Sequence, residues 1–336
     1  MFDSKVDVPV MLIFFNRPES FRKVFEAVKC ARPSKLFLVQ DGAREGNKKD
    51  LENVELCRKI ADDIDWKCDV KKFYSSVNLG CGMRMYTGIS ECFKMVDELI
   101  ILEDDCVPNF DFFLFCKEML DKYKNDQRIN MICGMNNLEV YKDTEYSYLF
   151  SSIGSCWGWA TWKRVWNLMD YNMNFINDIE AMTLINNLIK PIEYRDELVK
   201  TGKERYALLN SGKKLTAWTY QFGMIRYLYS QLIIVPKVNL ICNKGLTSDS
   251  THAVNSINKI PKDLQHLFNM KTYNLNFPLN HPNYIIENRD YYNKVRKIMR
   301  WDKKKIIESY VRQFLYSNKA EKIKLIKKFK NKLTRG

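Results

Sequence analysis

Three consecutive carboxylates, Glu103, Asp104 and Asp105, directly follow the apolar run 99–102. Such a run predicts a buried strand, and in an open α/β sheet ligands bind beyond the carboxyl ends of the strands. Carboxylate oxygens at this place suit Mn²⁺ or Mg²⁺ held jointly with substrate phosphates. Because three adjacent negative charges repel one another, a cation should offset them. A solvated acidic turn whose Asp residues cap a helix is the alternative that these three residues leave open.

Two other predicted strands also end in polar side chains. Asn16 and Arg17 follow the apolar run 8–15, and Asp41 follows the run 35–40. Adjacent strand ends would bring these side chains to one crevice. There a carboxylate can accept a hydrogen bond from the N–H of a base, and an arginine supplies a planar fork of donors.

A glycine-containing segment at 78–82, with the sequence NLGCG, precedes Arg84 near a predicted helix start. Main-chain N–H groups and the helix dipole favour phosphate at such a place, so Asn78 and Arg84 are candidates for binding a ligand's phosphates. Asn and Gly also form ordinary turns, and that is the alternative for this segment.

Strands and helices alternate over the first third of the chain, which predicts a sheet built from βαβ units. The apolar runs 8–15, 35–40 and 99–102 are typical of strands buried on both faces of a parallel sheet. Apolar stripes with helical spacing separate them: Phe21, Val24, Phe25 and Val28; Leu51, Val54, Ile60, Ala61 and Ile64; and Met85, Ile89, Phe93 and Val96.

The second half is less regular. We expect a helical stretch at 178–209, a strand at 232–235 on the same sheet, and a surface loop over the Asn- and Pro-rich residues 261–288. Tryptophans occur at 157, 159, 162 and 166. We expect Trp162 and Trp166 in the core, and leave the other two open between core packing and stacking on a sugar ring.

The positive charge is concentrated at the C-terminal end. The formal net charge is +14, and residues 289–336 hold 17 Lys and Arg against 4 Asp and Glu, so the remainder is near neutral. A content of 46% hydrophobic residues excludes a chain disordered throughout. We expect 301–336 to be a basic helical tail that binds an anionic membrane surface through Ile323, Ile326, Phe329 and Leu333. A solvated helix packed on the body is the alternative.

The cysteines and the apolar run 8–15 both favour a cytoplasmic location. The ten cysteines form no CxxC pair, and we expect Cys30, Cys92 and Cys116 to face helix interiors, as reduced thiols in a cytoplasm do. The run 8–15 is too short to span a bilayer and lacks a preceding basic region, so we expect neither a signal peptide nor a transmembrane helix. A cytoplasmic protein, peripheral on the inner face of the membrane through its tail, is the prediction.

Three segments together resemble a known family. Residues 9–18 (PVMLIFFNRP), 38–42 (LVQDG) and 102–113 (LEDDCVPNFDFF) are similar to GT-A nucleotide-sugar glycosyltransferases of the N-acetylglucosaminyltransferase I type and their bacterial relatives. The GluAspAsp triplet stands for the Asp-x-Asp motif of that superfamily. A further block at 154–162 (GSCWGWATW) resembles the bacterial branch, and the resemblance spans about residues 8–252.

The resemblance implies roles for residues that match the family's motifs. Asp105 would bind the metal, Asp104 the ribose and Glu103 the donor sugar, while Arg17 and Asp41 would hold the uracil. The cofactor is accordingly Mn²⁺ or Mg²⁺.

Two later positions also match the family. Trp218 would align with a tryptophan beside the acceptor site, and His252 with a region that closes over the donor; a surface histidine is the alternative. The eukaryotic enzymes invert the anomeric centre with an Asp in a Trp-Asp-Asp-Trp segment, but the aligned residues 218–221 here read WTYQ. We expect inversion by a base supplied elsewhere, and Asp249 is the nearest candidate.

The predicted fold is α/β of the GT-A type, a Rossmann-like, mostly parallel sheet flanked by helices, with a basic helical C-terminal extension. We expect one glycosyltransferase domain over 1–260, with a nucleotide-binding half at 1–135 and an acceptor half at 136–260. A surface-wrapping segment at 261–300 and the tail at 301–336 would follow.

The predicted function is metal-dependent transfer of a sugar from a nucleotide-diphosphate donor, with UDP favoured, to a hydroxyl of a carbohydrate or lipid-linked oligosaccharide. Surface polysaccharide or lipopolysaccharide synthesis is the expected pathway. A metal-dependent nuclease or nucleic-acid-binding protein is the main alternative, and a non-catalytic interaction module is a third. A nuclease would explain the basic tail but not Arg17 and Asp41, so we expect no nucleic-acid partner.

Overall fold

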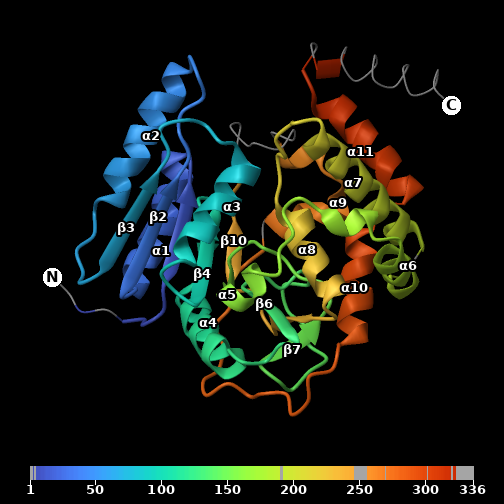
Figure 1. Cartoon of the computed structure of the whole chain (residues 1–336). Helices are drawn as coiled ribbons and strands as arrows, with labels where there is room; N and C mark the ends of the chain where they lie inside the picture. Colours follow the sequence, from blue (N-terminus) through green and yellow to red (C-terminus); the bar gives the residue numbers. More distant parts are fainter. Residues whose placement is uncertain are drawn as a thin grey trace.

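The computed structural model describes residues 3, 5–189, 192–245, 256–268, 270–300, 302–318 and 321–322. They form a mixed α/β fold around a large sheet flanked by helices, with the N-terminal strands at one side of the molecule and helices α6 to α11 at the other (Figure 1).

Within the described residues, eight strands form one sheet in the order β3-β2-β1-β4-β8-β6-β9-β7. Four of its seven strand pairs are parallel, so the sheet is mostly parallel, as predicted. The strands are β1 (Val10–Phe14), β2 (Lys35–Gln40), β3 (Asp69–Tyr74), β4 (Glu98–Glu103), β6 (Ile129–Cys133), β7 (Tyr148–Ser151), β8 (Trp159–Trp162) and β9 (Leu232–Pro236). Beside it, β5 (Cys106–Pro108) and β10 (Ile241–Asn243) pair antiparallel.

The four strands expected from apolar runs are confirmed, whereas β3, β5, β6, β7, β8 and β10 were not expected. The runs 8–15, 35–40, 99–102 and 232–235 correspond to β1, β2, β4 and β9. One of the missed strands, β3, lies at the edge of the sheet and carries exposed lysines, so it lacks a continuous apolar run. An edge strand needs burial on one side only, which explains the weak signal.

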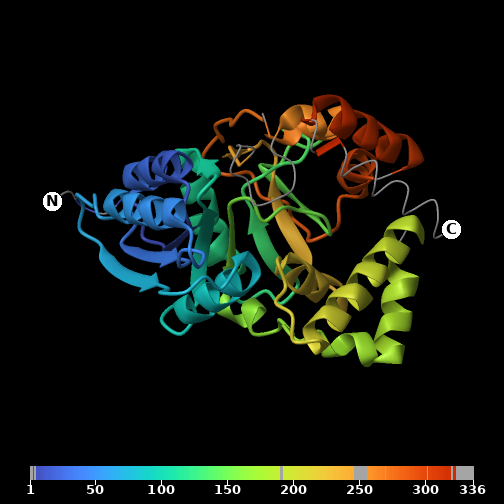
Figure 2. The ribbon, with the colours of Figure 1, turned by 90° about the horizontal axis from the view of Figure 1, so that it is seen from above.

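The helices of the first third are α1 (Pro18–Ala31), α2 (Lys48–Ala61), α3 (Cys81–Cys92) and α4 (Phe110–Tyr123). Helix α1 begins at a proline, whose fixed φ suits the first helical position. Seen from above, α1 and α2 lie on one face of the sheet and α3 on the other (Figure 2). Two side-chain placements were wrong: Leu51 is 57% exposed, because α2 buries its other face, and Cys30 is also exposed.

Further helices follow in the second half: α5 (Lys163–Trp166), α6 (Ile179–Leu188), α7 (Ile192–Asn210), α8 (Thr219–Leu228), α9 (Lys262–Gln265), α10 (Arg289–Met299) and α11 (Lys303–Tyr316), with 3₁₀ turns at Asn174–Asn177, Ile257–Lys259 and His266–Phe268. The helical stretch expected at 178–209 is therefore two helices, which project from the body in Figure 2. Trp162 and Trp166 are buried as expected, and Trp159 is also core, whereas Trp157 is half-buried.

The segment 261–288 runs along the body mainly as loop, with short helical turns at its start. It is attached to the main sheet, since Phe150 of β7 bridges Glu287. Helix α10 then buries Tyr291 and Val295 against the core. Of the described residues, none belongs to a helix with both the length and the apolarity needed to cross a bilayer. The apolar residues expected on the tail, from 323 onward, lie outside the described residues.

Candidate active site

The polar strand ends meet at the point where the strand order reverses. Strand β1 pairs in parallel with β2 on one side and β4 on the other, with Phe14 opposite Gln40 and Ile13 opposite Glu103. Ligands in open α/β sheets bind at such a switch point, beyond the carboxyl ends of the strands. The structure thus brings together the side chains that the sequence predicted to converge. A cavity lies there, which we call the Asp41 pocket; its lining includes Arg17, Asp41, Arg44, Asn78, Arg84, Glu103 and Asp104.

Arg17 is the cation that offsets the acidic triplet. Its Nη1 donates to Asp105 Oδ2 at 2.9 Å, and its Nη2 donates to Asp104 Oδ1. Asp104 also accepts from the main-chain N–H of Phe15 at 3.2 Å and is 3% exposed. The expectation of a cation beside the triplet is confirmed, and the guanidinium is held by carboxylates on both of its arms.

Burial disfavours the charged form of two of the three carboxylates, Glu103 and Asp104. Burial, with the negative charges of Asp105 and Asp104, raises the pKa of Glu103 to about 8. Burial also raises the pKa of Asp104 to about 6, although Arg17 opposes this shift. The neighbouring Cys81 is a neutral thiol, because burial and the same carboxylates raise its pKa to about 12. The site is therefore poised to receive a cation or a hydrogen-bond donor.

Asp41 organises the segment that the sequence singled out at 78–82. Its Oδ1 accepts from the N–H groups of Gly42 at 3.0 Å and Leu79 at 2.8 Å. Its Oδ2 accepts from Gly80 N at 2.9 Å and Asn78 Nδ2 at 3.1 Å. Gly80 has φ +81°, a backbone conformation that suits glycine, immediately before α3. A contact between Asp41 and uracil stays a prediction. The structure adds a role that the sequence did not indicate, since Asp41 holds the segment 78–80 in place.

Arg84 lines the Asp41 pocket and also connects α3 to the sheet. It is 7% exposed, and its guanidinium donates to the carbonyls of Gln40, at 3.1 Å, and Phe73. These bonds tie α3 to the ends of β2 and β3. A phosphate contact, which stays a prediction, would have to come from a guanidinium that already donates to two main-chain carbonyls.

Sequence reasoning missed Arg44, which also lines the Asp41 pocket. Its Nε lies 2.5 Å and its Nη2 2.7 Å from the carboxylate of Asp50, which also accepts from Asn16 Nδ2 at 2.7 Å. The Arg44 side chain is 59% exposed, so it offers a cation at the rim. The available signal was its place in the polar loop directly after β2.

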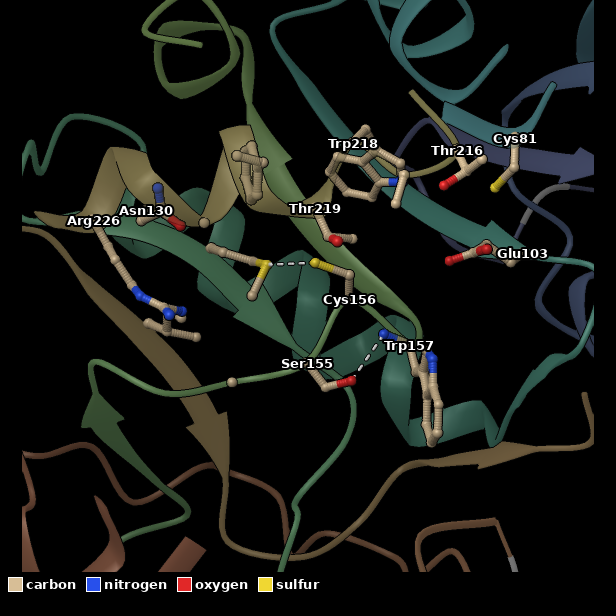
Figure 3. Close-up of a pocket in the computed structure, with 16 residues that line it drawn as sticks. Cys81, Glu103, Asn130, Ser155, Cys156, Trp157, Thr216, Trp218, Thr219 and Arg226 are labelled. Atoms are coloured by element: carbon tan, nitrogen blue, oxygen red, sulfur yellow. Dashed lines mark hydrogen bonds between the residues drawn. The ribbon is translucent and has the colours of Figure 1, made fainter. Parts of the chain in front are cut away.

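A second cavity adjoins the first. We call it the Trp218 pocket; it has a volume of about 400 Å³, and its lining includes Glu103, Asn130, Ser155, Trp157, Trp218 and Arg226. Glu103 and Cys81 line both pockets. Figure 3 shows Glu103 and Arg226 on opposite sides of the cavity, with Trp218 and Trp157 between them. A volume of this size suits a small organic ligand.

Two tryptophans shape the Trp218 pocket in different ways. Trp218 is 2% exposed and stacks on Trp159, with ring centroids 5.4 Å apart, so most of it is core. Trp157 is half-buried and packs against Phe268, with centroids 5.0 Å apart. The sequence singled out both residues, but it carried no signal for Asn130 or Arg226, since neither belongs to a motif.

The residues fit a metal held jointly with a ligand. Asp105 Oδ1 faces Cys106 Sγ at 3.3 Å and Asn243 Nδ2 at 3.5 Å, while Oδ2 faces Arg17. A Cβ on Gly245 would lie 2.3 Å from Asp105 Oδ2, so this position has no room for a side chain. No group of three or more His, Cys, Asp or Glu that could hold a metal occurs among the described residues. Mg²⁺ and Mn²⁺ commonly bind through one carboxylate plus substrate phosphates, which this arrangement allows.

The two residues predicted in the loop after β10 are not placed. Asp249 and His252 lie outside the described residues, so their roles as base and donor contact stay predictions.

Comparisons with known proteins add a likeness of fold. No protein-family model matches the chain, and no curated protein matches it. Among solved structures, one of UDP-glucose pyrophosphorylase complexed with UDP-glucose is similar over 70% of this chain and 92% of that chain. Its sequence identity is 12% and its TM-score is 0.33, so we build the function from the residues alone.

Proposed function

We propose that this chain is a metal-dependent glycosyltransferase that moves a sugar from a nucleotide-diphosphate donor to a hydroxyl acceptor. One observation carries the proposal: two adjoining cavities meet at the end of β4, where Glu103 lines both and Asp104 lines the Asp41 pocket. Sugar transfer needs two binding spaces that meet at the anomeric carbon. The Asp41 pocket at the strand switch suits a nucleotide, and the aromatic-walled Trp218 pocket suits a sugar.

Each part of the donor would be bound by a different residue at the strand ends. Uracil would lie by Asp41, the ribose by Asp104 and the donor sugar by Glu103. Arg17, and Mn²⁺ or Mg²⁺ held by Asp105, would face the diphosphate. The metal, when bound, would neutralise the charge of the departing diphosphate. Asn78 and Arg84 would lie on the phosphate side of the same pocket.

The reaction we propose is displacement at the anomeric carbon. The acceptor oxygen bonds to that carbon, the bond to the diphosphate oxygen breaks, and the acceptor proton passes to a base through an oxocarbenium-like transition state. Of the described residues that line the Trp218 pocket, Glu103 is the single carboxyl group. Since we assign Glu103 to the donor sugar, we propose that Asp249 supplies the base, and that Trp218 and His252 contact the substrates.

A membrane-bound acceptor would explain the C-terminal region. Helix α11 begins with Lys303, Lys304 and Lys305 and leaves large apolar side chains exposed; these are Ile307, Val311, Phe314 and Leu315 at 44% to 62%. A basic helix with an apolar face is suited to an anionic membrane surface. We propose that α11 and the tail hold the enzyme against the membrane that carries a lipid-linked oligosaccharide of a surface polysaccharide or lipopolysaccharide.

A panel of nucleotide sugars, tested with and without Mn²⁺, examines the proposed function. We expect a UDP-sugar to raise the melting temperature only when Mn²⁺ is present, because a bound ligand stabilises the folded state by mass action. The Asp105→Asn variant should fold but lose both this response and turnover, while Asp97→Asn, at a highly exposed carboxylate, should retain them. Formation of UTP from the UDP-sugar and pyrophosphate would instead show a nucleotidyltransferase.

A further inference from the structure

Arg226 of α8 is a charged side chain in the Trp218 pocket without a counter-ion. Its Nη2 reaches two phenol oxygens at the limit of hydrogen bonding, Tyr227 at 3.4 Å and Tyr194 at 3.5 Å. Its Nε is buried and has no hydrogen-bond partner. In the described part of the chain, no carboxylate lies within ion-pair distance of it. A buried charge in this state is costly, which calls for a reason to retain it.

Three other arginines with little exposure have their donors taken up by acceptors of the protein. Arg164 donates to three main-chain carbonyls, those of Tyr123, Lys124 and Ile129, at 2.8–3.1 Å. Arg17 pairs with two carboxylates, and Arg84 donates to two carbonyls. The fold can therefore supply acceptors to an arginine that it partly buries. Arg226 differs because its donors are held beside a cavity instead of against the protein.

A second cation reinforces the positive charge around Arg226. The guanidinium of Arg296, from α10, lies 3.6 Å from the ring centroid of Tyr194, and its Nε is also buried without a partner. Across the described residues, Arg296 has no carboxylate in an ion pair. Arg226 in turn lies 4.9 Å from the ring centroid of Tyr227, so each arginine contacts a phenol ring, and neither has a carboxylate partner among the described residues.

The opposite side of the same cavity has the opposite character. Glu103, one of the three adjacent carboxylates, lies there (Figure 3). Between the two ends are the half-buried ring of Trp157 and the side chain of Ser155, while Asn130 lies beside Arg226 (Figure 3). A sugar ring placed between them would direct one end toward Glu103 and the other toward Arg226. An arginine fork binds the oxygens of a carboxylate or a phosphate in pairs.

We propose that the Trp218 pocket takes an acceptor sugar that carries an oxyanion, a carboxylate or a phosphate ester, and that Arg226 pairs with it. This inference rests on the proposed function, because it takes the occupant of the pocket to be the acceptor substrate. It adds the charge of that substrate. The anion completes the coordination that Arg226 lacks in the free protein. It also orients the ring, so that a hydroxyl on the far side faces Glu103 and the donor.

Matched sugars test the proposal through the fluorescence of the pocket tryptophans. We expect the wild-type chain to bind methyl β-D-glucuronide or glucose 6-phosphate at least about tenfold more tightly than methyl β-D-glucoside. The two anionic probes distinguish a carboxylate from a phosphate ester. Equal binding of all three sugars would overturn the proposal, and so would inorganic phosphate that binds as tightly as glucose 6-phosphate.

Variants then assign the preference to Arg226. Arg226→Met should abolish the preference for the anionic sugar and leave the melting temperature equal or higher, because an unpaired charge is removed; Arg226→Lys should keep part of the preference. Arg195→Met, which removes the same charge from α7 outside the Trp218 pocket, should change nothing. An unchanged preference in Arg226→Met or Arg226→Lys would refute the role of Arg226. Binding of UDP with Mn²⁺, measured separately, tests the proposed function, so the two can fail independently.

Discussion

Arg17 and Asp105 form an ion pair across the ends of two parallel strands, with 2.9 Å between Nη1 and Oδ2. The arginine follows β1 and the aspartate follows β4, which are neighbours in the sheet. The carboxylate oxygen that we assign to a metal thus faces the guanidinium in the free protein. A metal bound through this oxygen would therefore compete with the ion pair.

Removal of Arg17 should therefore strengthen the binding of Mn²⁺ alone. In Arg17→Ala the carboxylates of Asp104 and Asp105 lose their cation, so we expect the affinity for Mn²⁺ without nucleotide to rise about tenfold, or about 1.4 kcal/mol. Affinity for UDP should fall, because the diphosphate loses a donor. Electron paramagnetic resonance of free Mn²⁺ measures the first effect and calorimetry the second. With Arg17→Lys, which keeps the charge, Mn²⁺ affinity should stay near that of the wild type; an unchanged affinity in Arg17→Ala would contradict the competition.

Asp41 should determine selectivity for uridine nucleotides. Its carboxylate can accept the N3–H of uracil, whereas cytosine offers no proton there, so we expect UDP to bind more tightly than CDP. Asp41→Ala should reduce UDP affinity by about 1–3 kcal/mol. It should also lower the melting temperature, since four donors from residues 42 and 78–80 lose their acceptor.

Calorimetry with UDP, CDP and GDP separates the two roles of Asp41. Asn78→Ala is the matched control, since it removes one donor from the same network and leaves the carboxylate in place. If Asp41→Ala weakens UDP and CDP by the same factor, the residue positions the segment and does not read the base.

The buried Asp50 should make stability depend on acidic pH. The hydrogen bond from Arg44 is the main cause that holds the pKa of Asp50 below its ordinary value of 3.8. A lowered pKa means that the folded state favours the carboxylate, so the stabilisation is complete well above pH 3.8 and is lost as the pH falls through the lowered value. Asp50→Ala should reduce the free energy of unfolding by about 1–3 kcal/mol at pH 7.

Urea denaturation of the wild type and Asp50→Ala from pH 7 down to pH 3 measures this difference. The two curves should converge at the acidic end. Asp63→Ala, which removes an exposed partner of Lys29, should change the free energy of unfolding by less than about 1 kcal/mol. A gap between wild type and Asp50→Ala that stays constant with pH would show that the lost stability does not come from the charge.

The transfer should invert the anomeric centre. Residues 218–221 carry no carboxylate, and the hydroxyl groups of Thr219 and Tyr220 are poor bases at pH 7; burial raises the pKa of Tyr220 further, to about 12. We expect Asp249→Asn to reduce turnover by about 10²-fold or more, as for loss of a general base. NMR of the fresh product reads the stereochemistry, and retention of the donor configuration would rule out the inverting mechanism. Unchanged turnover in Asp249→Asn would reject that residue alone.

The C-terminal region should bind anionic vesicles. Each basic residue near such a surface contributes about 1 kcal/mol, and residues 319–336 contain many lysines. Co-sedimentation with phosphatidylserine-containing and neutral liposomes provides the test. We expect strong binding to the anionic vesicles only, and its loss on deletion of 319–336. Equal binding to both vesicles, or no effect of the deletion, would exclude a membrane role for the tail.

The part of the candidate site at the strand ends was predictable because its signals are local. An apolar run buried on both faces marks a strand, and the polar residues that follow it must lie at the carboxyl end of the sheet. Arg17, Asp41 and the triplet at 103–105 follow from this rule alone. The same rule failed for β3, whose exposed edge allows lysines in place of an apolar run.

Tertiary structure alone decided which groups satisfy one another and which do not. No spacing in the sequence pairs Arg17 with Asp104 and Asp105, since 87 and 88 residues separate them. Likewise Arg84 and Arg226 are both arginines on helices beside the sheet. One is bonded to main-chain carbonyls, and the other has an unpartnered Nε beside a cavity. A side chain's type is local information, whereas its partners depend on segments that only the packed sheet brings together.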